Sequence, residues 1–194
     1  MNLLYLQLFD WGFFFGDILR EEILSQQKFE STIKRLSHEI IENIDSEIPL
    51  AIIGVKTRGI FLARRIVSNI NNISNINMSV GDLDVTFYRD DLSSEIKRRK
   101  IVGKTSIPFS CKGKQLILVD DVLQTGRTIR AALSTLVSFG RPKFLRLAVM
   151  VDRGMREFPV KADFVGKNLS IENKKSVKVM LKEIDGTDGV FSVS

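Results

Sequence analysis

The sequence is poor in the residues that build disulfide frameworks and clustered metal sites. It has one cysteine, Cys111, and one histidine, His38, in 194 residues. A single thiol excludes an internal disulfide, and it excludes a metal site made of several cysteines. We therefore expect Cys111 to be an inert thiol near the start of a strand, in a protein of the reducing cytoplasm.

Two common phosphate-binding fingerprints are also missing. The glycine pattern G-x-G-x-x-G of dinucleotide-binding folds does not occur. The stretch VGKTS at residues 102–106 resembles the end of a Walker A loop, but the glycine required five residues before Gly103 is Arg98. These absences exclude a Rossmann-type dinucleotide site and a P-loop.

The chain has no long hydrophobic run that is free of charges. The first residues, MNLLYLQLFDWGFFFGDILREE, are apolar, but Asp10 and Asp17 interrupt them and no Lys or Arg precedes the apolar part. This pattern fits neither a signal peptide nor a membrane-spanning helix. We expect residues 1–22 to be an N-terminal extension, either poorly ordered or docked on the domain or a partner subunit, with membrane contact the least favoured alternative. Residues 23–194 are expected to form one domain.

The overall composition is that of a folded, basic protein. Hydrophobic residues make up 44% and charged residues 27%, which is typical of a globular domain. The formal charge of +6 and the pI of about 9.5 favour anionic partners. Phosphorylated metabolites and RNA satisfy this charge equally well.

Hydrophobic periodicity predicts alternating strands and helices. Residues 29–44 repeat apolar side chains at helical spacing, with Ser31 or Thr32 as the cap. The Asn-rich residues 68–79 are expected to be a surface connection. Further helices are expected at 59–70 and 128–140, and strands at 50–55, 80–88, 115–120, 144–152, 161–166 and 176–184. This order predicts right-handed βαβ crossovers and a mostly parallel sheet covered on both faces.

Two polar stretches follow buried strands, where open α/β sheets bind ligands. VKTRG covers residues 55–59, and DDVLQTGRT covers residues 120–128. In the second stretch, the backbone N–H groups of residues 125–128 at a helix N-terminus can bind a phosphate. Asp120 and Asp121 can accept the two hydroxyl protons of a cis-diol. The stretch therefore predicts a ligand with a phosphate and a vicinal diol, in preference to a Walker B strand or acids that merely cap a strand.

Several motifs resemble one enzyme family. LILVDDVLQTGRT resembles the phosphoribosyl diphosphate (PRPP) signature of type I phosphoribosyltransferases. The stretches GVKTRGIFLARRI, VGDLDVTFYRDDLS and GRPKFLRLAVMVDRGMREFPVKADFVGKN are similar to the PyrR proteins, which regulate pyrimidine operon attenuation and are also uracil phosphoribosyltransferases. The resemblance covers about residues 23–190. It implies the type I fold, a mostly parallel twisted sheet flanked by helices, with a mobile lid over the carboxyl ends of the strands.

The resemblance implies the reaction of uracil with PRPP to give UMP and pyrophosphate, with Mg²⁺. Asp120 and Asp121 would hold the ribose diol directly or through Mg²⁺ and water, and Arg58 and Arg89 complete the implied catalytic set. The pyrophosphate would meet the loop around Arg58, in which related enzymes have a non-proline cis peptide. The full PRPP-binding set is Lys56, Thr57, Arg58, Gly59, Arg89, Asp120, Asp121, Val122, Leu123, Gln124, Thr125, Gly126, Arg127 and Thr128.

The implied base site and lid lie further along the chain. Arg153 and Val165 match contact positions near the base, and Phe164 is expected to stack on uracil. Asp152 stands where purine-salvage relatives place a lysine, which favours uracil over hypoxanthine and guanine. The candidate lid runs from Arg89 to about Ile107. Within it, KRRK at residues 97–100 is more simply a solvated surface run than part of the site.

Two positions depart from the family pattern. Gln124 stands where PyrR proteins usually carry Tyr and purine-salvage relatives carry an acidic base, and Gln cannot act as a general base. Met155 stands where a histidine is usual in the loop that family members use, with the first helix, to bind RNA. The remaining RNA-binding candidates are Lys34, Arg35, His38 and Lys161.

Two functions stay open from the sequence. The chain is expected to be a uracil phosphoribosyltransferase that also binds pyrimidine leader mRNA in response to UMP or UTP. The alternatives are a salvage enzyme alone, or a nucleotide-sensing regulator with little transferase activity. The resemblance also implies a homodimer or a larger homo-oligomer.

Overall fold

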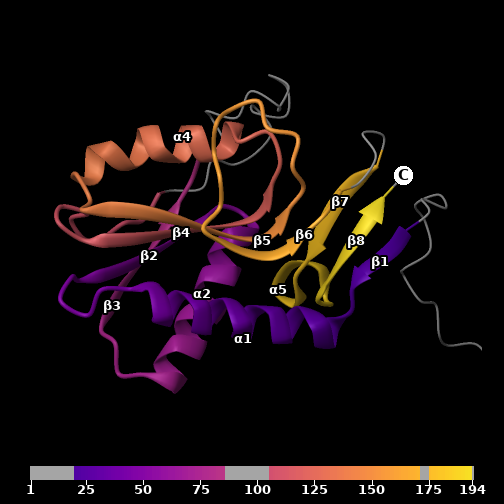
Figure 1. The fold of residues 1–194 in the computed structure, drawn as a ribbon, viewed down its shortest axis with the longest axis horizontal. Helices are drawn as coiled ribbons and strands as arrows, with labels where there is room; N and C mark the ends of the chain where they lie inside the picture. Colours follow the sequence, from indigo (N-terminus) through magenta and orange to yellow (C-terminus); the bar gives the residue numbers. More distant parts are fainter. Residues whose placement is uncertain (1–19, 86–104, 171–174, 194) are drawn as a thin grey trace, which may run out of the picture.

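The computed structural model describes residues 20–85, 105–170 and 175–193. A five-stranded sheet with helices on both faces forms the larger part, and a three-stranded sheet lies beside it (Figure 1). Arg89, the KRRK run and most of the predicted lid lie outside the described residues. Within the described ranges, no helix combines the length and the apolar character needed to cross a bilayer.

The central sheet is fully parallel, as the sequence predicts. Its strands run in the order β3-β2-β4-β5-β6, with parallel pairing between all neighbours. The strands are β2 (Leu50–Val55), β3 (Met78–Leu83), β4 (Gln115–Leu123), β5 (Phe144–Asp152) and β6 (Phe164–Asn168). Because all five are parallel, their carboxyl ends meet at one edge of the sheet.

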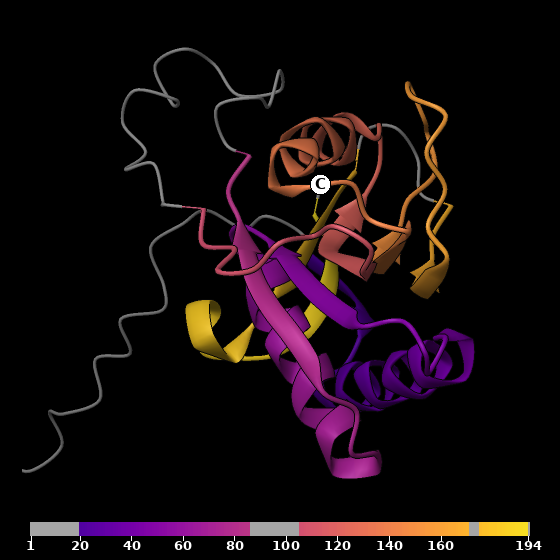
Figure 2. The same cartoon turned by 90° about the vertical axis from the view of Figure 1, so that its left-hand side faces the viewer.

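Helices cover both faces of this sheet (Figures 1 and 2). Helices α1 (Gln26–Asn43) and α2 (Arg58–Ile73) pack on one face, and α4 (Arg127–Leu136), followed by the short helix η2 (Val137–Phe139), packs on the other. Alternate residues of β4 serve the two cores: Ile117 belongs to the α1–α2 side and Leu118 to the α4 side. Continuous apolar strands are typical of a sheet buried on both faces.

Two predicted boundaries in the first half of the chain were wrong. The cap of α1 is Ser25, whose Oγ accepts the N–H of Lys28 at 3.5 Å, and not Ser31 or Thr32. The hydroxyls of Ser31 and Thr32 instead bond back to the carbonyls one turn earlier within the helix. The Asn-rich connection is also shorter than expected, because α2 continues to Ile73 and β3 begins at Met78.

The smaller sheet, which we call the side sheet, joins both ends of the described chain. It consists of β1 (Arg20–Leu24), β8 (Gly189–Val193) and β7 (Ser176–Met180), paired antiparallel in the order β1-β8-β7. Residues 20–22, which we expected to belong to the N-terminal extension, are part of β1. The strand predicted over 176–184 was too long, because it ends at Met180 and is followed by the short helix α5 (Lys182–Asp185).

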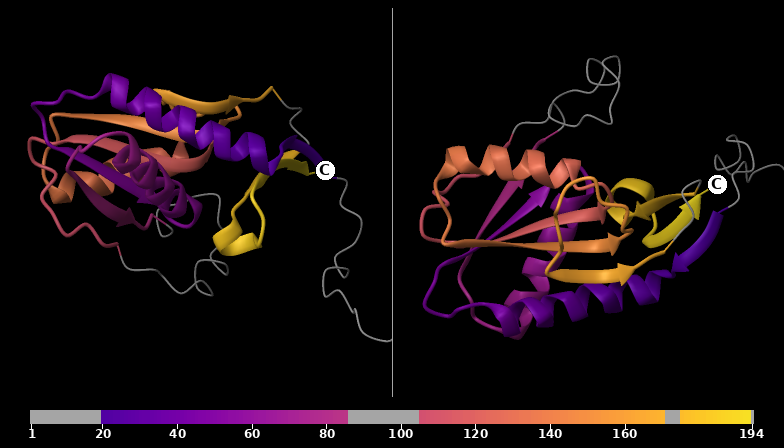
Figure 3. Two further views of the ribbon diagram at one scale, coloured as in Figure 1. Left: turned by 90° about the horizontal axis from the view of Figure 1, so that it is seen from below. Right: turned by 45° about the horizontal axis from the view of Figure 1, so that its top comes forward.

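The side sheet lies beyond the carboxyl edge of the central sheet (Figure 3). Two arginines of α2 hold α5 in place. Arg65 binds Glu183 and Asp188, and Arg58 binds Asp185. These ion pairs hold α5 against α2, and β7, which precedes α5 in the chain, contacts β4.

Candidate functional site

A pocket of about 410 Å³ lies at the carboxyl edge of the central sheet. It forms where β2 leads into α2 and where β4 leads into α4, and one residue of the side sheet, Val177, completes it. Its lining residues are Lys56, Thr57, Arg58, Asp120, Asp121, Val122, Leu123, Gln124, Thr125, Gly126, Arg127, Thr128, Ile129 and Val177. The fold therefore brings together two stretches that lie more than sixty residues apart.

Within the predicted PRPP-binding set, Arg89 lies outside the described residues. Gly59 is described and does not line this pocket. Gly59 is buried under the first turn of α2, where a Cβ atom would lie 2.4 Å from the carbonyl oxygen of Val119. Gly59 therefore allows α2 to begin directly against β4.

The paired acids lie within β4, which is longer than the strand predicted over residues 115–120. The strand continues to Leu123, which pairs with Asp152 of β5. Asp120 is 5% exposed, and its Oδ1 accepts the N–H of Asp121 at 2.9 Å, whereas Asp121 is half-buried. Strand pairing therefore fixes the backbone of both acids at the rim of the pocket.

The N-terminus of α4 forms a cradle for an anion. Gly126 caps the helix with φ 88°, and a Cβ atom there would lie 3.3 Å from the Cβ of Phe158. The carbonyl of Thr125 accepts the N–H groups of Glu157 and Phe158 at 2.9 and 3.0 Å. The helix dipole and the N–H groups of its first turn favour a negative charge at this point.

The loop between β2 and α2 faces the same pocket. The peptide bond between Lys56 and Thr57 is cis, at the place where the sequence resemblance implied one. Lys56 Nζ lies 3.9 Å from Asp84 Oδ2. Arg58 Nη2 donates to both carboxylate oxygens of Asp185 at 3.0 and 3.1 Å. The loop therefore presents a lysine and an arginine to the pocket, each next to an acid.

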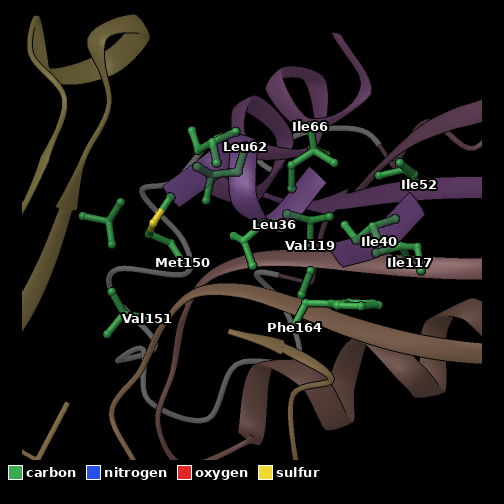
Figure 4. Packing of buried hydrophobic residues seen from close by; sticks show 14 of the residues in the cluster. Leu36, Ile40, Ile52, Leu62, Ile66, Ile117, Val119, Met150, Val151 and Phe164 are labelled. Atoms are coloured by element: carbon green, nitrogen blue, oxygen red, sulfur yellow. The ribbon is translucent and has the colours of Figure 1, made fainter. Parts of the chain in front are cut away.

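Phe164 cannot stack on a base in this structure, so that prediction was wrong. Its side chain is 4% exposed and packs in the core between the sheet and α1, near Leu36, Ile40 and Ile117 (Figure 4). Val165 faces the other way and packs against the core on the α4 side. Because successive side chains of a strand point to opposite faces, only one of this pair can be turned away from the α1 core.

Asp152 and Arg153 lie next to the pocket but do not line it. Asp152 accepts a bond from Arg156 at 2.5 Å and from the N–H of Gly154 at 2.8 Å. The backbone N–H of Arg153 donates to the carbonyl of Leu123 at 2.9 Å. Arg153 is 7% exposed, its Nη2 donates to the carbonyl of Lys175, and its Nε has no partner among the described residues.

Arg156 has a structural role that the sequence did not predict. Its guanidinium donates to the carbonyls of Gln124 at 2.7 Å, Gly154 at 3.0 Å and Val160 at 2.8 Å, and to Asp152 at 2.5 Å. It thereby ties the loop after β5 to the pocket loop after β4. The only sequence signal was the spacing of four between Asp152, Arg156 and Val160.

The predicted RNA-binding residues differ in their availability. Lys34, His38 and Lys161 are exposed. Arg35 is also exposed, but its Nη2 donates to the carbonyls of Val165 and Gly166 at 3.1 and 2.6 Å, and it pairs with Glu39. Arg35 therefore joins α1 to β6, which the sequence did not predict.

Asp120 and Asp121 are the pocket residues with oxygen ligands suited to Mg²⁺. In the described parts of the chain, no group of three or more His, Cys, Asp or Glu side chains could hold a metal ion. Asp120 and Asp121 are two oxygen donors at one rim of the pocket. Mg²⁺ usually keeps several waters and binds one or two carboxylates together with substrate phosphates. The pair therefore fits a magnesium ion that binds with a phosphorylated ligand, and does not fit a resident metal centre.

Comparison with known proteins agrees with the family resemblance of the sequence motifs. The model of the phosphoribosyl transferase domain matches residues 20–183. Proteins named "Bifunctional protein PyrR" are similar over most of the chain. The one from Deinococcus radiodurans is 51% identical, covering 86% of this chain and 90% of its own. Those from Elusimicrobium minutum and Thermus aquaticus are 48% and 47% identical, covering 84% and 88% of this chain and 91% and 94% of their own.

Two hypoxanthine phosphoribosyltransferases are among the solved structures with a similar fold. The enzyme from Staphylococcus aureus has a TM-score of 0.66 and 19% identity, covering 90% of this chain and 92% of its own. That from Trypanosoma cruzi has a TM-score of 0.70 and 16% identity, covering 91% and 92%. At this identity the likeness concerns the fold alone.

Proposed function

Because the chain belongs to the PyrR family of phosphoribosyltransferases, we propose that its pocket binds PRPP and uracil to make UMP, and binds UMP or UTP to control a pyrimidine leader mRNA. The observation that supports this best is the meeting of the loops at residues 56–58 and 120–128 in one pocket. One loop supplies cations and the other supplies paired acids and a helix N-terminus. PRPP carries a pyrophosphate, a diol and a 5′-phosphate, which need these three kinds of group.

Each part of PRPP has a proposed partner. The N–H groups and hydroxyls of residues 125–128 bind the 5′-phosphate, with the dipole of α4 behind them. Asp120 and Asp121 accept hydrogen bonds from the ribose diol, and Lys56 and Arg58 meet the pyrophosphate. Magnesium, held by Asp120 and Asp121 through water and by the ligand's oxygens, would neutralise charge on the leaving pyrophosphate.

The charged residues of the pocket suit the transfer of ribose phosphate from PRPP to uracil. Bond breaking at the anomeric carbon builds positive charge on the ribose, which the nearby Asp120 and Asp121 carboxylates stabilise. The pyrophosphate leaves toward Lys56 and Arg58. Gln124 cannot take the proton from uracil N1, because an amide does not titrate near neutral pH. We therefore propose that uracil reacts as its anion or loses the proton to a group other than Gln124.

The regulatory function uses the same pocket and a different surface. We propose that UMP fills the phosphate cradle and the base site, and that the occupied protein binds leader mRNA through exposed polar and basic side chains of α1 and the loop before β6. Lys34, His38 and Lys161 are the candidates there. We also propose a homodimer or larger homo-oligomer, which sedimentation of the full chain would measure.

Calorimetric titration with PRPP and Mg²⁺ tests the pocket assignment directly. The variant Asp120→Asn/Asp121→Asn is expected to lose PRPP binding, because each lost charge-assisted hydrogen bond is worth about 1.5 to 3 kcal/mol. Glu21→Gln/Glu22→Gln removes the same charge from adjacent exposed residues of β1 and serves as the control. Unchanged PRPP affinity in the folded Asp120/Asp121 variant would refute the assignment.

A further inference from the structure

The ion pairs between α2 and α5 form a group that we call the α5 clasp: Arg58, Arg65, Glu183, Asp185 and Asp188. Arg65 donates to Glu183 at 2.9 and 2.5 Å and to Asp188 at 2.9 Å. Arg58 donates to Asp185 at 3.0 and 3.1 Å. The two halves of the clasp have similar chemistry, but only Arg58 lines the pocket.

Asp185 is a fixed anchor for its arginine. Its side chain is 12% exposed, and its Oδ2 also accepts the backbone N–H of Leu181 at 2.9 Å. Burial alone would raise the pKa of the Asp185 carboxyl, but the Leu181 N–H and the Arg58 guanidinium outweigh this and lower the pKa. The carboxylate therefore stays charged and held at neutral pH, so its position determines where Arg58 Nη2 lies.

Arg58 keeps donors that Asp185 does not use. A guanidinium has five N–H groups, and both bonds to Asp185 come from Nη2. The Nε of Arg58 is buried and has no partner among the described residues. A buried donor without a partner is unusual. Because Nε is buried, a ligand oxygen in the pocket would meet the Nη groups of Arg58 in this orientation.

We propose that Asp185 is a positioning residue of the transferase reaction, which holds the Arg58 guanidinium in the orientation that receives the pyrophosphate of PRPP. A free arginine must lose its rotamer freedom when it binds a ligand, whereas Arg58 has already lost it. Helix α5, which connects β7 to β8, therefore contributes to the pocket through an acid that acts on Arg58. This inference rests on the proposed assignment of pyrophosphate to the loop at residues 56–58.

Steady-state kinetics with uracil and PRPP varied separately test the proposal. Asp185→Ala is expected to raise KM for PRPP by about tenfold, which corresponds to the freedom that one arginine side chain regains. KM for uracil should stay unchanged, and Asp185→Asn, which keeps an acceptor oxygen, should show a smaller rise. Glu183→Gln is the matched control, because it removes a charge from the clasp at an arginine outside the pocket.

A double-mutant cycle separates action through Arg58 from general effects. In an Arg58→Gln background, Asp185→Ala should cause no further rise in KM for PRPP. An equal rise with Glu183→Gln would overturn the proposal, since it would show only a loosened side sheet. A lower KM in Asp185→Ala would also overturn it, because the carboxylate would then only repel the pyrophosphate.

The Arg58→Gln and Asp185→Ala variants together distinguish an error about Asp185 from an error about the pyrophosphate site. If Arg58→Gln alone leaves KM for PRPP unchanged, the pyrophosphate does not meet this loop, and the function assignment of the loop is wrong. If Arg58→Gln raises KM while Asp185→Ala does not, only the positioning role of Asp185 is refuted.

Discussion

Arg156 shows how one side chain can hold two loops of a binding site. It donates to four backbone carbonyls and to Asp152, and these partners lie at the ends of β4 and β5 or in the loops that follow them. Backbone carbonyls in loops need such donors, because no strand or helix satisfies them. The shape of the pocket at Gln124 therefore depends on a residue that does not line it.

Replacing Arg156 by Met should destabilise the protein by about 2 to 4 kcal/mol, since it leaves several half-buried acceptors without a donor. Urea denaturation measures this change. Arg156→Lys should recover only part of it, because an ammonium group cannot reach the same fork of acceptors. A loss below about 0.5 kcal/mol in Arg156→Met is the scale of an ordinary surface substitution. It would show that the hydrogen bonds of Arg156 are not needed for stability.

Several residues could be assigned to the pocket region from sequence, because motif spacing and strand ends carry that information. The stretch 120–128 follows a buried strand, so its place at the carboxyl edge was predictable. Phe164 was misplaced because the sequence gives the alternation of a strand but not which face it turns to α1. Asp185 and Arg156 were missed because their partners are backbone atoms or residues far away in the chain.

At the scale of elements, the central sheet was more predictable than the side sheet. Long apolar strands such as β4 and β5 have a strong pattern, and helices between them imply parallel order. The strands β1 and β8 are five residues long, and among the described strands β1 pairs with β8 alone, which lies between β1 and β7. A pairing between the two ends of the described chain has no local signal in the sequence.

The α5 clasp should make stability depend on pH. Burial would raise the pKa of the Asp188 carboxyl, but Arg65 and the N–H of Lys182 lower it below its ordinary value. A lowered pKa contributes stability that is present above the ordinary carboxyl range and is lost as the pH falls through the folded-state value.

We therefore expect Asp188→Asn to reduce the free energy of unfolding at pH 7 and to make a smaller difference as the pH falls below about 4. Denaturant unfolding of both proteins at several pH values measures this. A difference that stays constant down to pH 3 would contradict an ionised clasp, because it would reflect packing alone.

At the scale of the whole molecule, RNA binding separates a regulator from a salvage enzyme. The charge of +6 supports salt-dependent attraction to RNA of any sequence, so specificity must be measured against scrambled RNA. UMP should strengthen binding of the cognate pyrimidine leader. Lys34→Ala should weaken it and reduce the salt slope by about one contact.

Arg35 is also a predicted RNA-binding residue, but its side chain has a structural role as well. Arg35→Ala should also weaken RNA binding, but it removes bonds to the Val165 and Gly166 carbonyls, so its stability must be measured in parallel. If the leader binds no better than scrambled RNA with and without UMP, attenuation should be abandoned and salvage kept as the function.

We propose above all that the pocket at the carboxyl edge of the sheet makes UMP from uracil and PRPP. The most direct test is a competition assay in which the protein receives PRPP, Mg²⁺ and equal amounts of uracil and hypoxanthine, and both nucleotides are measured. We predict that UMP forms, that the hypoxanthine nucleotide does not, and that Asp120→Asn/Asp121→Asn abolishes UMP formation. Efficient formation of the hypoxanthine nucleotide would show that the pocket is not specific for uracil. UMP formation at the wild-type rate by the double variant would show that Asp120 and Asp121 do not hold PRPP.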